Sequence, residues 1–254
     1  MYELLNKELF YSSKNQLNVV KNKSGEFIAK VVNKIYKQLL IIDPINKKII
    51  PKELYFLRLL NESGHSPKVI DFHENESSFT VIIEYLNDNW VDLFSFVDIQ
   101  REERIVKQII RNVIITLEKL SKIGIYHVDI KQENIMVNVE NYAIKMIDFE
   151  DAIFDCSQSA TSNMWVGTLG YRSPETYKNI CYDIKSSQVF SIGCLIYSCL
   201  ELKRPYDSEE DVLRNRRKES YHSSKLALDL MDKCMEMDPE DRIQFNQITS
   251  HDWF

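Results

Sequence analysis

The stretch Ile125-Tyr-His-Val-Asp-Ile-Lys-Gln-Glu-Asn-Ile-Met-Val-Asn138, continued by Ala143-Ile-Lys-Met-Ile-Asp-Phe-Glu150, carries most of the chemically informative residues. An Asp stands two residues after a His, a Lys follows two residues later, and an Asn comes five residues after the Asp. A second Asp lies fourteen residues beyond the Asn, in a strand-like apolar run. Together these side chains suit phosphoryl transfer: a carboxylate faces the incoming hydroxyl, a Lys stabilises phosphoryl charge, and Asn with the second Asp holds a divalent metal.

The composition is that of an ordinary globular chain. Its 254 residues suffice for one large or two small domains, with 44% hydrophobic and 28% charged residues. The formal net charge of -6 argues against direct nucleic-acid binding, which needs an excess of Lys and Arg. Five cysteines without a Cys-x-x-Cys pair favour a reducing compartment. Since we see no signal-peptide core and no run of membrane-spanning length, we expect an intracellular protein, cytoplasmic or nuclear, that does not bind membranes.

The N-terminal third is predicted to be rich in strands. β-prone segments separated by turn signals predict strands at 17–20, 27–32, 68–72 and 79–85. The segment 33–50 is ambiguous, because an apolar run and an Asp-Pro turn alternate in it. From Pro51 to Glu62 the sequence predicts a helix with three leucines on one face.

Two charged residues of this region are candidates for phosphate binding. Lys30 lies in the second of these strands, and Glu53 on the helix could pair with it and aim it. The simpler interpretations are an exposed strand Lys and a solvated helix Glu. The polar break at 84–88 reads as a hinge whose backbone groups could bind an adenine ring.

The rest of the chain is predicted to be mainly helical. Apolar residues at helical spacing predict helices at 92–97, 102–123, 189–200 and 226–237, with a short helix near the C-terminus. The segment 151–163 is polar and reads as a loop.

Taken together, these residues resemble the catalytic domain of eukaryotic-type protein kinases across essentially the whole chain. The matching positions, in family order, are Lys30, Glu53, His127-x-Asp129-x-Lys131-x-x-Asn134, Asp148-Phe149, Gly167-Thr168, Tyr171-x-Ser-Pro-Glu175, Ser191-Ile-Gly193, Arg242 and His251-Asp-Trp-Phe254. Within the family the chain is most similar to the Pim-like kinases of the calcium/calmodulin-dependent group. That similarity is carried by Pro51-x-Glu53, Val91-Asp-Leu-Phe-Ser-Phe96 and Ile130-Lys-Gln-Glu-Asn134.

The resemblance implies a fold and an activity. The fold would be a bilobal α+β domain, with a small β-rich N-lobe at 1–86 and a larger, mainly helical C-lobe at 87–254. The activity would be transfer of the γ-phosphate of ATP to a Ser or Thr hydroxyl of a protein substrate. Mg²⁺ would be the metal, with Mn²⁺ as an alternative.

The resemblance also assigns roles to residues. Asp129 would accept the proton of the substrate hydroxyl, and Lys131 would neutralise the transferring phosphoryl group and mark Ser/Thr specificity. Asn134 and Asp148 would hold the metal, and Thr168 would belong to the substrate platform. The expected ATP-binding residues are Lys30, oriented by Glu53, Leu17 and Ile28 above the adenine, Met136 beneath it, and the backbones of Glu84 and Leu86 at its edge.

Two further pairs of residues follow from the same resemblance. Glu175 and Arg242 would form a buried ion pair that pins the substrate-binding segment. Asp92 and Glu133 occupy positions resembling those that hold substrate Arg in basophilic relatives, so an Arg-containing substrate is a hypothesis, with solvated carboxylates as its alternative.

Three departures from the family pattern affect how ATP is held and how activity is switched. The glycine-rich loop is missing, because its slots fall on Phe10, Ser12 and Asn15; each charge-assisted hydrogen bond lost there would cost about 1.5–3 kcal/mol. Val128 replaces an Arg that would bind a phosphate on the activation segment, so switching by phosphorylation there is doubtful. Glu150 replaces a Gly, which is expected to stiffen the hinge that moves Asp148.

These departures keep two alternatives open. A pseudokinase that binds or regulates other proteins is favoured by the missing glycines and opposed by the intact base and metal residues. A small-molecule phosphotransferase is suggested by Ile147-Asp-Phe-Glu-Asp-Ala152, which is similar to aminoglycoside- and choline-kinase-like sequences. The segment 167–175, the helix at 191–193 and Arg242 oppose that second alternative, because they belong to a protein-substrate platform.

Overall fold

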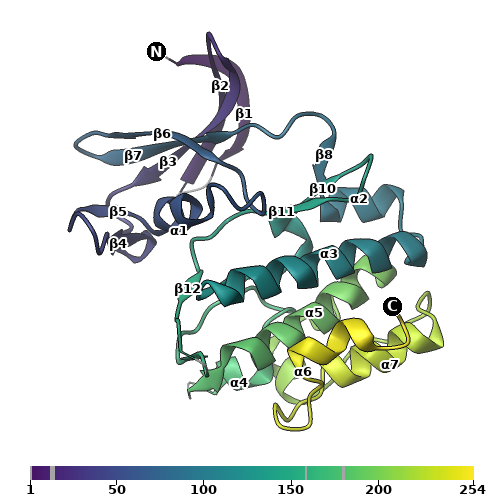
Figure 1. Cartoon of the computed structure of the whole chain (residues 1–254). Coiled ribbons are helices and arrows are strands. Elements are labelled where there is room, and N and C mark those ends of the chain that lie inside the picture. Colours follow the sequence, from purple (N-terminus) through teal and green to yellow (C-terminus); the bar gives the residue numbers. More distant parts are fainter. Residues whose placement is uncertain (1, 12–14, 158, 179–180) are drawn as a thin grey trace. The chain divides into compact units, whose positions relative to one another are not determined.

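The structure of the chain is a computed structural model that describes residues 2–11, 15–157, 159–178 and 181–254. The chain forms two compact units, Met1–Asn89 with Lys145–Glu150, and Trp90–Ile144 with Asp151–Phe254. The first unit is built on a β-sheet and the second mainly on helices (Figure 1). The expected α+β class is therefore confirmed.

The sheet of the first unit has five antiparallel strands in the order β1-β2-β3-β7-β6 (Figure 1). They are β1 (Glu3–Tyr11), β2 (Asn15–Asn22), β3 (Gly25–Asn33), β6 (Val69–Glu74) and β7 (Ser78–Glu84). Gly25 opens β3 with a φ of 142°, a backbone conformation that favours glycine and ends the predicted turn. All four strands predicted in this region are present, with ends that differ by a few residues.

A hairpin and a helix complete the first unit. After a 3₁₀ turn, η1 (Lys37–Leu39), the strands β4 (Leu40–Ile42) and β5 (Ile49–Pro51) pair antiparallel and lead into α1 (Lys52–Leu60). Inward-facing Ile50 of β5 packs with Leu54 of α1 and Val81 of β7 in a buried cluster. The ambiguous segment is thus a hairpin, and the predicted helix is confirmed.

The second unit contains the remaining helices (Figure 1). They are α2 (Leu93–Ile99), α3 (Glu103–Lys122), α4 (Pro174–Tyr177), α5 (Ile184–Glu201), α6 (Glu209–Leu213), α7 (Lys225–Cys234) and the 3₁₀ helices η2 (Gln132–Asn134) and η3 (Phe245–Ser250). Short strands lie at β8 (Trp90–Asp92), β9 (Ile125–Tyr126), β10 (Ile135–Asn138), β11 (Ile144–Met146), β12 (Ile153–Phe154), β13 (Thr161–Ser162) and β14 (Tyr182–Asp183). The four predicted helices are confirmed, and the predicted terminal helix has 3₁₀ geometry. Two of the two-residue strands fall inside the predicted loop 151–163.

Helix α5 forms the centre of this unit. Nearly every residue from Gln188 to Glu201 is buried, as expected for a helix that is apolar nearly all round. A Cβ on Gly193 would lie 2.8 Å from Cys234 Cβ and from Met235 Cγ, so the glycine permits close packing of α5 against the end of α7. In the part of the chain that the structure describes, we find no helix with both the length and the apolar character needed to cross a bilayer.

Candidate active site

One face of the first unit's sheet carries the expected ATP-binding side chains of β2 and β3. Leu17 is paired directly with Lys30 across the two strands, and Ile28 lies two residues before Lys30. Because directly paired residues and residues two apart point to the same side of a sheet, Leu17, Ile28 and Lys30 share one face. Both apolar residues are only half buried, and they therefore offer apolar surface beside the Lys.

Lys30 is buried among three carboxylates. Its Nζ lies 2.6 Å from Glu53 Oε2, 2.6 Å from Glu150 Oε1 and 3.5 Å from Asp148 Oδ1. The Lys30–Glu53 pair has the arrangement expected from the sequence. The third partner, Glu150, was not expected as a contact of Lys30.

The electrostatics of this cluster reflect its excess of negative charge. Burial alone would lower the pKa of Lys30, but the adjacent carboxylates raise it, so the Lys stays charged. Burial, aided by the charges of Asp148 and Glu150, raises the pKa of Glu53 above its ordinary value against the opposing effect of Lys30. Three carboxylates sharing one cation leave a site that favours additional positive charge.

The backbone explains how Glu150 reaches Lys30. Asp148 has a φ of 62°, in the left-handed region, whereas Glu150 is not among the described residues with positive φ. The unusual conformation is thus at the Asp, and the residue that replaces Gly keeps an ordinary backbone and turns its side chain towards Lys30. One feature of the sequence is consistent with this contact, an acidic residue two positions after Asp148.

The second unit holds the other group of expected residues around Asp129. Lys131 Nζ donates to Asp129 Oδ2 at 2.7 Å and to Thr168 Oγ1 at 2.9 Å. The hydroxyl of Thr168 donates to Asp129 Oδ1 at 2.6 Å. Asn134 Nδ2 donates to both Oδ2 and the main-chain oxygen of Asp129, each at 2.9 Å. Three residues predicted from two separate motifs, Lys131, Asn134 and Thr168, therefore donate to the carboxylate of Asp129.

This environment keeps Asp129 ionised although it is largely buried. Burial alone would raise the pKa of Asp129, but the charge and hydrogen bond of Lys131 and the hydrogen bond of Thr168 lower it below its ordinary value. An ionised carboxylate held by fixed donors is suited to orient a hydroxyl group.

The two residues that precede Asp129, His127 and Val128, both contact other parts of the second unit. His127 is 1% exposed, and its main-chain oxygen accepts a hydrogen bond from Gln188 of α5. Val128 packs against a buried apolar cluster that includes Tyr126 and Tyr182. An apolar cluster thus occupies the surroundings of the side chain that replaces Arg.

The expected adenine-edge residues lie at and just after the end of β7. The amide of Glu84 donates to Lys68 O at 2.8 Å, and its carboxylate accepts from Lys145 Nζ at 2.6 Å. Leu86 comes two residues after the last residue of this strand, and Met136 lies half buried in β10 of the other unit. Among the glycine-loop slots, Ser12 lies outside the described residues, and only the strand assignment of Phe10 and Asn15 is described.

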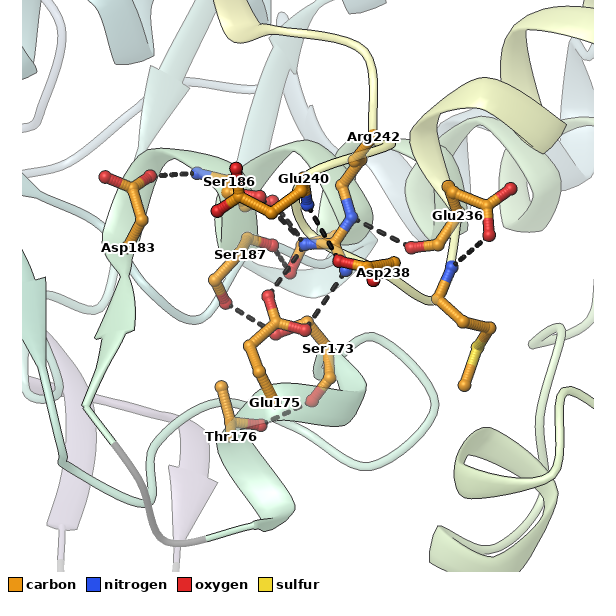
Figure 2. Close-up of polar contacts among 12 residues, drawn as sticks. Ser173, Glu175, Thr176, Asp183, Ser186, Ser187, Glu236, Asp238, Glu240 and Arg242 are labelled. Atoms are coloured by element: carbon orange, nitrogen blue, oxygen red, sulfur yellow. Dashed lines mark hydrogen bonds and ion pairs between the residues drawn. The ribbon is translucent and has the colours of Figure 1, made fainter.

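The predicted ion pair between Glu175 and Arg242 is confirmed (Figure 2). Arg242 Nη1 lies 2.7 Å from Glu175 Oε1 and Nη2 lies 3.1 Å from Oε2, a bidentate arrangement in which both residues are 4% exposed. Arg242 also donates to the main-chain oxygens of Ser186 and Glu236 (Figure 2). These bonds tie α4 to the start of α5 and to the segment after α7.

The carboxylates considered for substrate Arg have different surroundings. Asp92 caps α2, accepting from the amide of Ser95 at 2.9 Å and from its hydroxyl at 2.8 Å. Glu133 is exposed within η2.

The expected residues thus form two groups, one in each unit. Lys30, Glu53 and Asp148 come together in the first unit, joined by Glu150. Asp129, Lys131, Asn134 and Thr168 come together in the second.

Comparison with known proteins identifies the family. The family model of the protein kinase domain matches residues 2–254, and the chain therefore belongs to the protein kinase family. It is 25% identical over 234 residues to serine/threonine-protein kinase PSK2 of Saccharomyces cerevisiae, covering 88% of this chain and 21% of the relative.

Two other relatives have the same kind of name. Serine/threonine-protein kinase 1 of African swine fever virus (isolate Pig/Kenya/KEN-50/1950) is 27% identical over 220 residues, covering 86% of this chain and 73% of the viral protein. Serine/threonine-protein kinase ppk6 of Schizosaccharomyces pombe is 24% identical over 256 residues, covering 98% of this chain and 32% of the relative. The chain spans about a fifth of PSK2 and a third of ppk6, but most of the viral kinase.

Proposed function

We propose that this protein is an ATP- and Mg²⁺-dependent protein kinase that phosphorylates Ser or Thr residues. The observation that carries the proposal is the ionised, largely buried Asp129 carboxylate held by Lys131, Asn134 and Thr168. The three relatives described above are all named serine/threonine-protein kinases, which supports the same activity. A Pim-like subgroup stays a hypothesis based on the short motifs alone.

The proposed chemistry at the acceptor uses Asp129 and Lys131. A Ser or Thr hydroxyl would donate its hydrogen bond to the Asp129 carboxylate, which takes up the proton as the hydroxyl oxygen bonds to the γ-phosphorus of ATP and the bond from that phosphorus to the β-phosphate oxygen breaks, releasing ADP. Lys131, already hydrogen-bonded to both Asp129 and Thr168, would bring its positive charge to the phosphoryl group. Thr168 would fix the substrate segment relative to Asp129.

Most of the residues in the proposed nucleotide site come from the first unit, and Asn134 comes from the second. Leu17 and Ile28 supply the apolar surface for adenine, and Lys30 supplies the cation for the phosphates. Oxygen ligands such as Asp148 and Asn134 are those that Mg²⁺ prefers, and the negative cluster beside Lys30 is chemically compatible with a divalent cation. When bound, the metal would neutralise charge on the phosphates.

Binding of Mg-ATP is the first test of this proposal. Mg-ATP is expected to raise the unfolding temperature of the wild-type protein, because a ligand that binds only the folded state stabilises it. Asp148→Asn should remove most of that shift, whereas Asp252→Asn, at an exposed position, should not. The absence of any shift in the wild type would favour the pseudokinase.

One observation keeps the pseudokinase as a second candidate. Glu150 already forms an ion pair with Lys30, with Oε1 2.6 Å from Nζ, so a nucleotide phosphate must compete with the Glu150 carboxylate for this cation. A protein that binds partners without transferring phosphate could keep this ion pair permanently.

The competition can be measured with Glu150→Gln, which keeps the shape and removes the charge. We expect this variant to bind Mg-ATP about tenfold more tightly in isothermal calorimetry, the equivalent of about 1.4 kcal/mol. Glu140→Gln, an exposed change, serves as the matched control and should leave the Kd unchanged. Weaker binding by Glu150→Gln would contradict the competition and make Glu150 a contributor to nucleotide or metal binding.

Two further expectations concern the substrate and the location of the protein in the cell. A protein substrate containing Arg remains the hypothesis based on Asp92 and Glu133, and a peptide array without basic preference would contradict it. An intracellular location, cytoplasmic or nuclear, remains our expectation, because free cysteines suit a reducing compartment.

A further inference from the structure

The hairpin of β4 and β5 exposes an unusual amount of apolar surface. Ile35, Ile42, Ile45 and Ile49 are 70%, 62%, 87% and 56% exposed. Four large aliphatic side chains exposed within fifteen residues of one segment form a patch, which is more informative than single exposed residues scattered over a surface.

The strand pattern shows that this patch is a second apolar face. Ile41 is paired with Ile50, and both pack towards the buried cluster of Leu54 and Val81. Ile42 is paired with Ile49, one residue closer to the turn on each strand, and these side chains therefore point to the opposite face. Strands that are apolar on both faces are usually covered by other groups on both faces.

A hollow lies on the outer face. A cavity of about 450 Å³ is lined by the apolar residues Leu40, Ile41, Ile42, Ile49 and Phe79 and by the charged residues Lys34, Lys37 and Glu74. Phe79 is 1% exposed, stacks on Phe72 and has Lys34 Nζ over its ring at 4.7 Å from the centroid, so this part of the lining is firmly held. We call this feature the hairpin groove. Its volume is within the range of ordinary ligand pockets and would accept a large apolar side chain.

The charge around the hairpin groove is opposite to that of the whole chain. The segment 33–52 contains Lys34, Lys37, Lys47, Lys48 and Lys52 and a single acid, Asp43, which gives a formal charge of 5 − 1 = +4 in a chain of net charge -6.

The acids near this segment are already engaged. The Asp43 carboxylate is buried and accepts from Ile45 N and Asn46 Nδ2 within its own turn. Glu74 also lines the groove and pairs with Lys34. Among the described residues, no ion pair is present for the lysines at 37, 47, 48 and 52.

We propose that the hairpin groove is a docking site for an acidic peptide segment of a partner protein, with a large apolar side chain seated against the paired side chains of Ile42 and Ile49. The apolar side chain fills the hollow, and Asp or Glu residues beside it complement the lysines. A concave groove can hold one anchoring side chain, whereas a flat lipid surface would not fill it. The proposal does not depend on the catalytic activity.

The test uses fluorescence anisotropy with a labelled peptide in which Phe alternates with Glu. We expect saturable binding to the wild-type protein that weakens as salt is raised, since Lys37, Lys47 and Lys48 are exposed. Replacing Glu by Lys, or Phe by Ser, in the peptide should each weaken binding at least about tenfold.

Variants of the protein distinguish binding at the hairpin groove from nonspecific binding to exposed apolar residues. The double variant Ile42→Ser/Ile49→Ser should weaken binding about tenfold, and Lys37→Glu should weaken it and reduce its salt dependence. Ile99→Ser is the matched control, because Ile99 is 88% exposed but lies at the end of α2. All sites are on the surface, and unchanged thermal unfolding checks that each variant is folded.

Several results would overturn the proposal. They are no saturable binding by the wild type, equal binding of the Lys-containing peptide, or equal loss of binding in Ile99→Ser. Binding of phosphatidylserine vesicles that depends on Ile42 and Ile49 would identify a membrane surface instead. Loss of wild-type self-association in the double variant would identify a second copy of this chain as the occupant.

Discussion

Asp129→Asn is expected to lower kcat for phosphate transfer by about 10²–10⁴-fold, the contribution of a positioned general base. The amide cannot take up the hydroxyl proton, and it has no negative charge to attract Lys131. The nucleotide-binding side chains of the first unit are untouched. The Kd for Mg-ATP should therefore change little while transfer is nearly abolished.

Two controls make that result interpretable. Asp252→Asn, at an exposed position, should keep wild-type kcat. Thermal unfolding of Asp129→Asn should stay close to that of the wild type, which shows that lost activity does not reflect lost folding. A variant that is folded, binds Mg-ATP and transfers phosphate at the wild-type rate would contradict the role of Asp129.

Arg242→Met is expected to destabilise the protein by about 3–5 kcal/mol, because it leaves the buried Glu175 carboxylate without its cation. The variant also removes the bonds of Arg242 to the main chain of Ser186 and Glu236. A fall in the midpoint of urea unfolding measures the effect. Since this pair holds α4 to the rest of the second unit, activity should fall together with stability.

The matched control is Arg216→Met. Arg216 is exposed and lies 3.7 Å from Glu210, and such surface pairs contribute about 0–1 kcal/mol. The double variant Glu175→Gln/Arg242→Met should recover part of the lost stability, because it removes the buried unpaired charge. Equal effects of the two Arg variants would show that the buried pair is energetically unimportant.

Much of the fold could be predicted from local pattern. The strands β2, β3, β6 and β7 and the helices α3, α5 and α7 have clear periodicity or apolar runs. The hairpin of β4 and β5 could not be assigned, because a hairpin that is apolar on both faces lacks the alternation that identifies a half-buried strand.

The candidate site shows a similar division. The proximity of Asp129, Lys131 and Asn134 could be predicted from their spacing alone, since they belong to one short loop. The Thr168 hydroxyl reaches Asp129 from a distant part of the chain, so family resemblance, not spacing, predicted its place in the substrate platform. The contact of Glu150 with Lys30 depends on the left-handed backbone at Asp148, which residue identity did not indicate.

The most direct test of the central proposal is transfer of labelled γ-phosphate from Mg-ATP to a peptide that contains one Ser flanked by Arg. The wild-type protein is expected to label this peptide and its Thr counterpart, but not the same peptide with Tyr, and Asp129→Asn should label none of them. Folded wild-type protein that binds Mg-ATP but labels no peptide or protein would contradict the kinase. Equal labelling by wild type and Asp129→Asn would show that the activity does not come from this site.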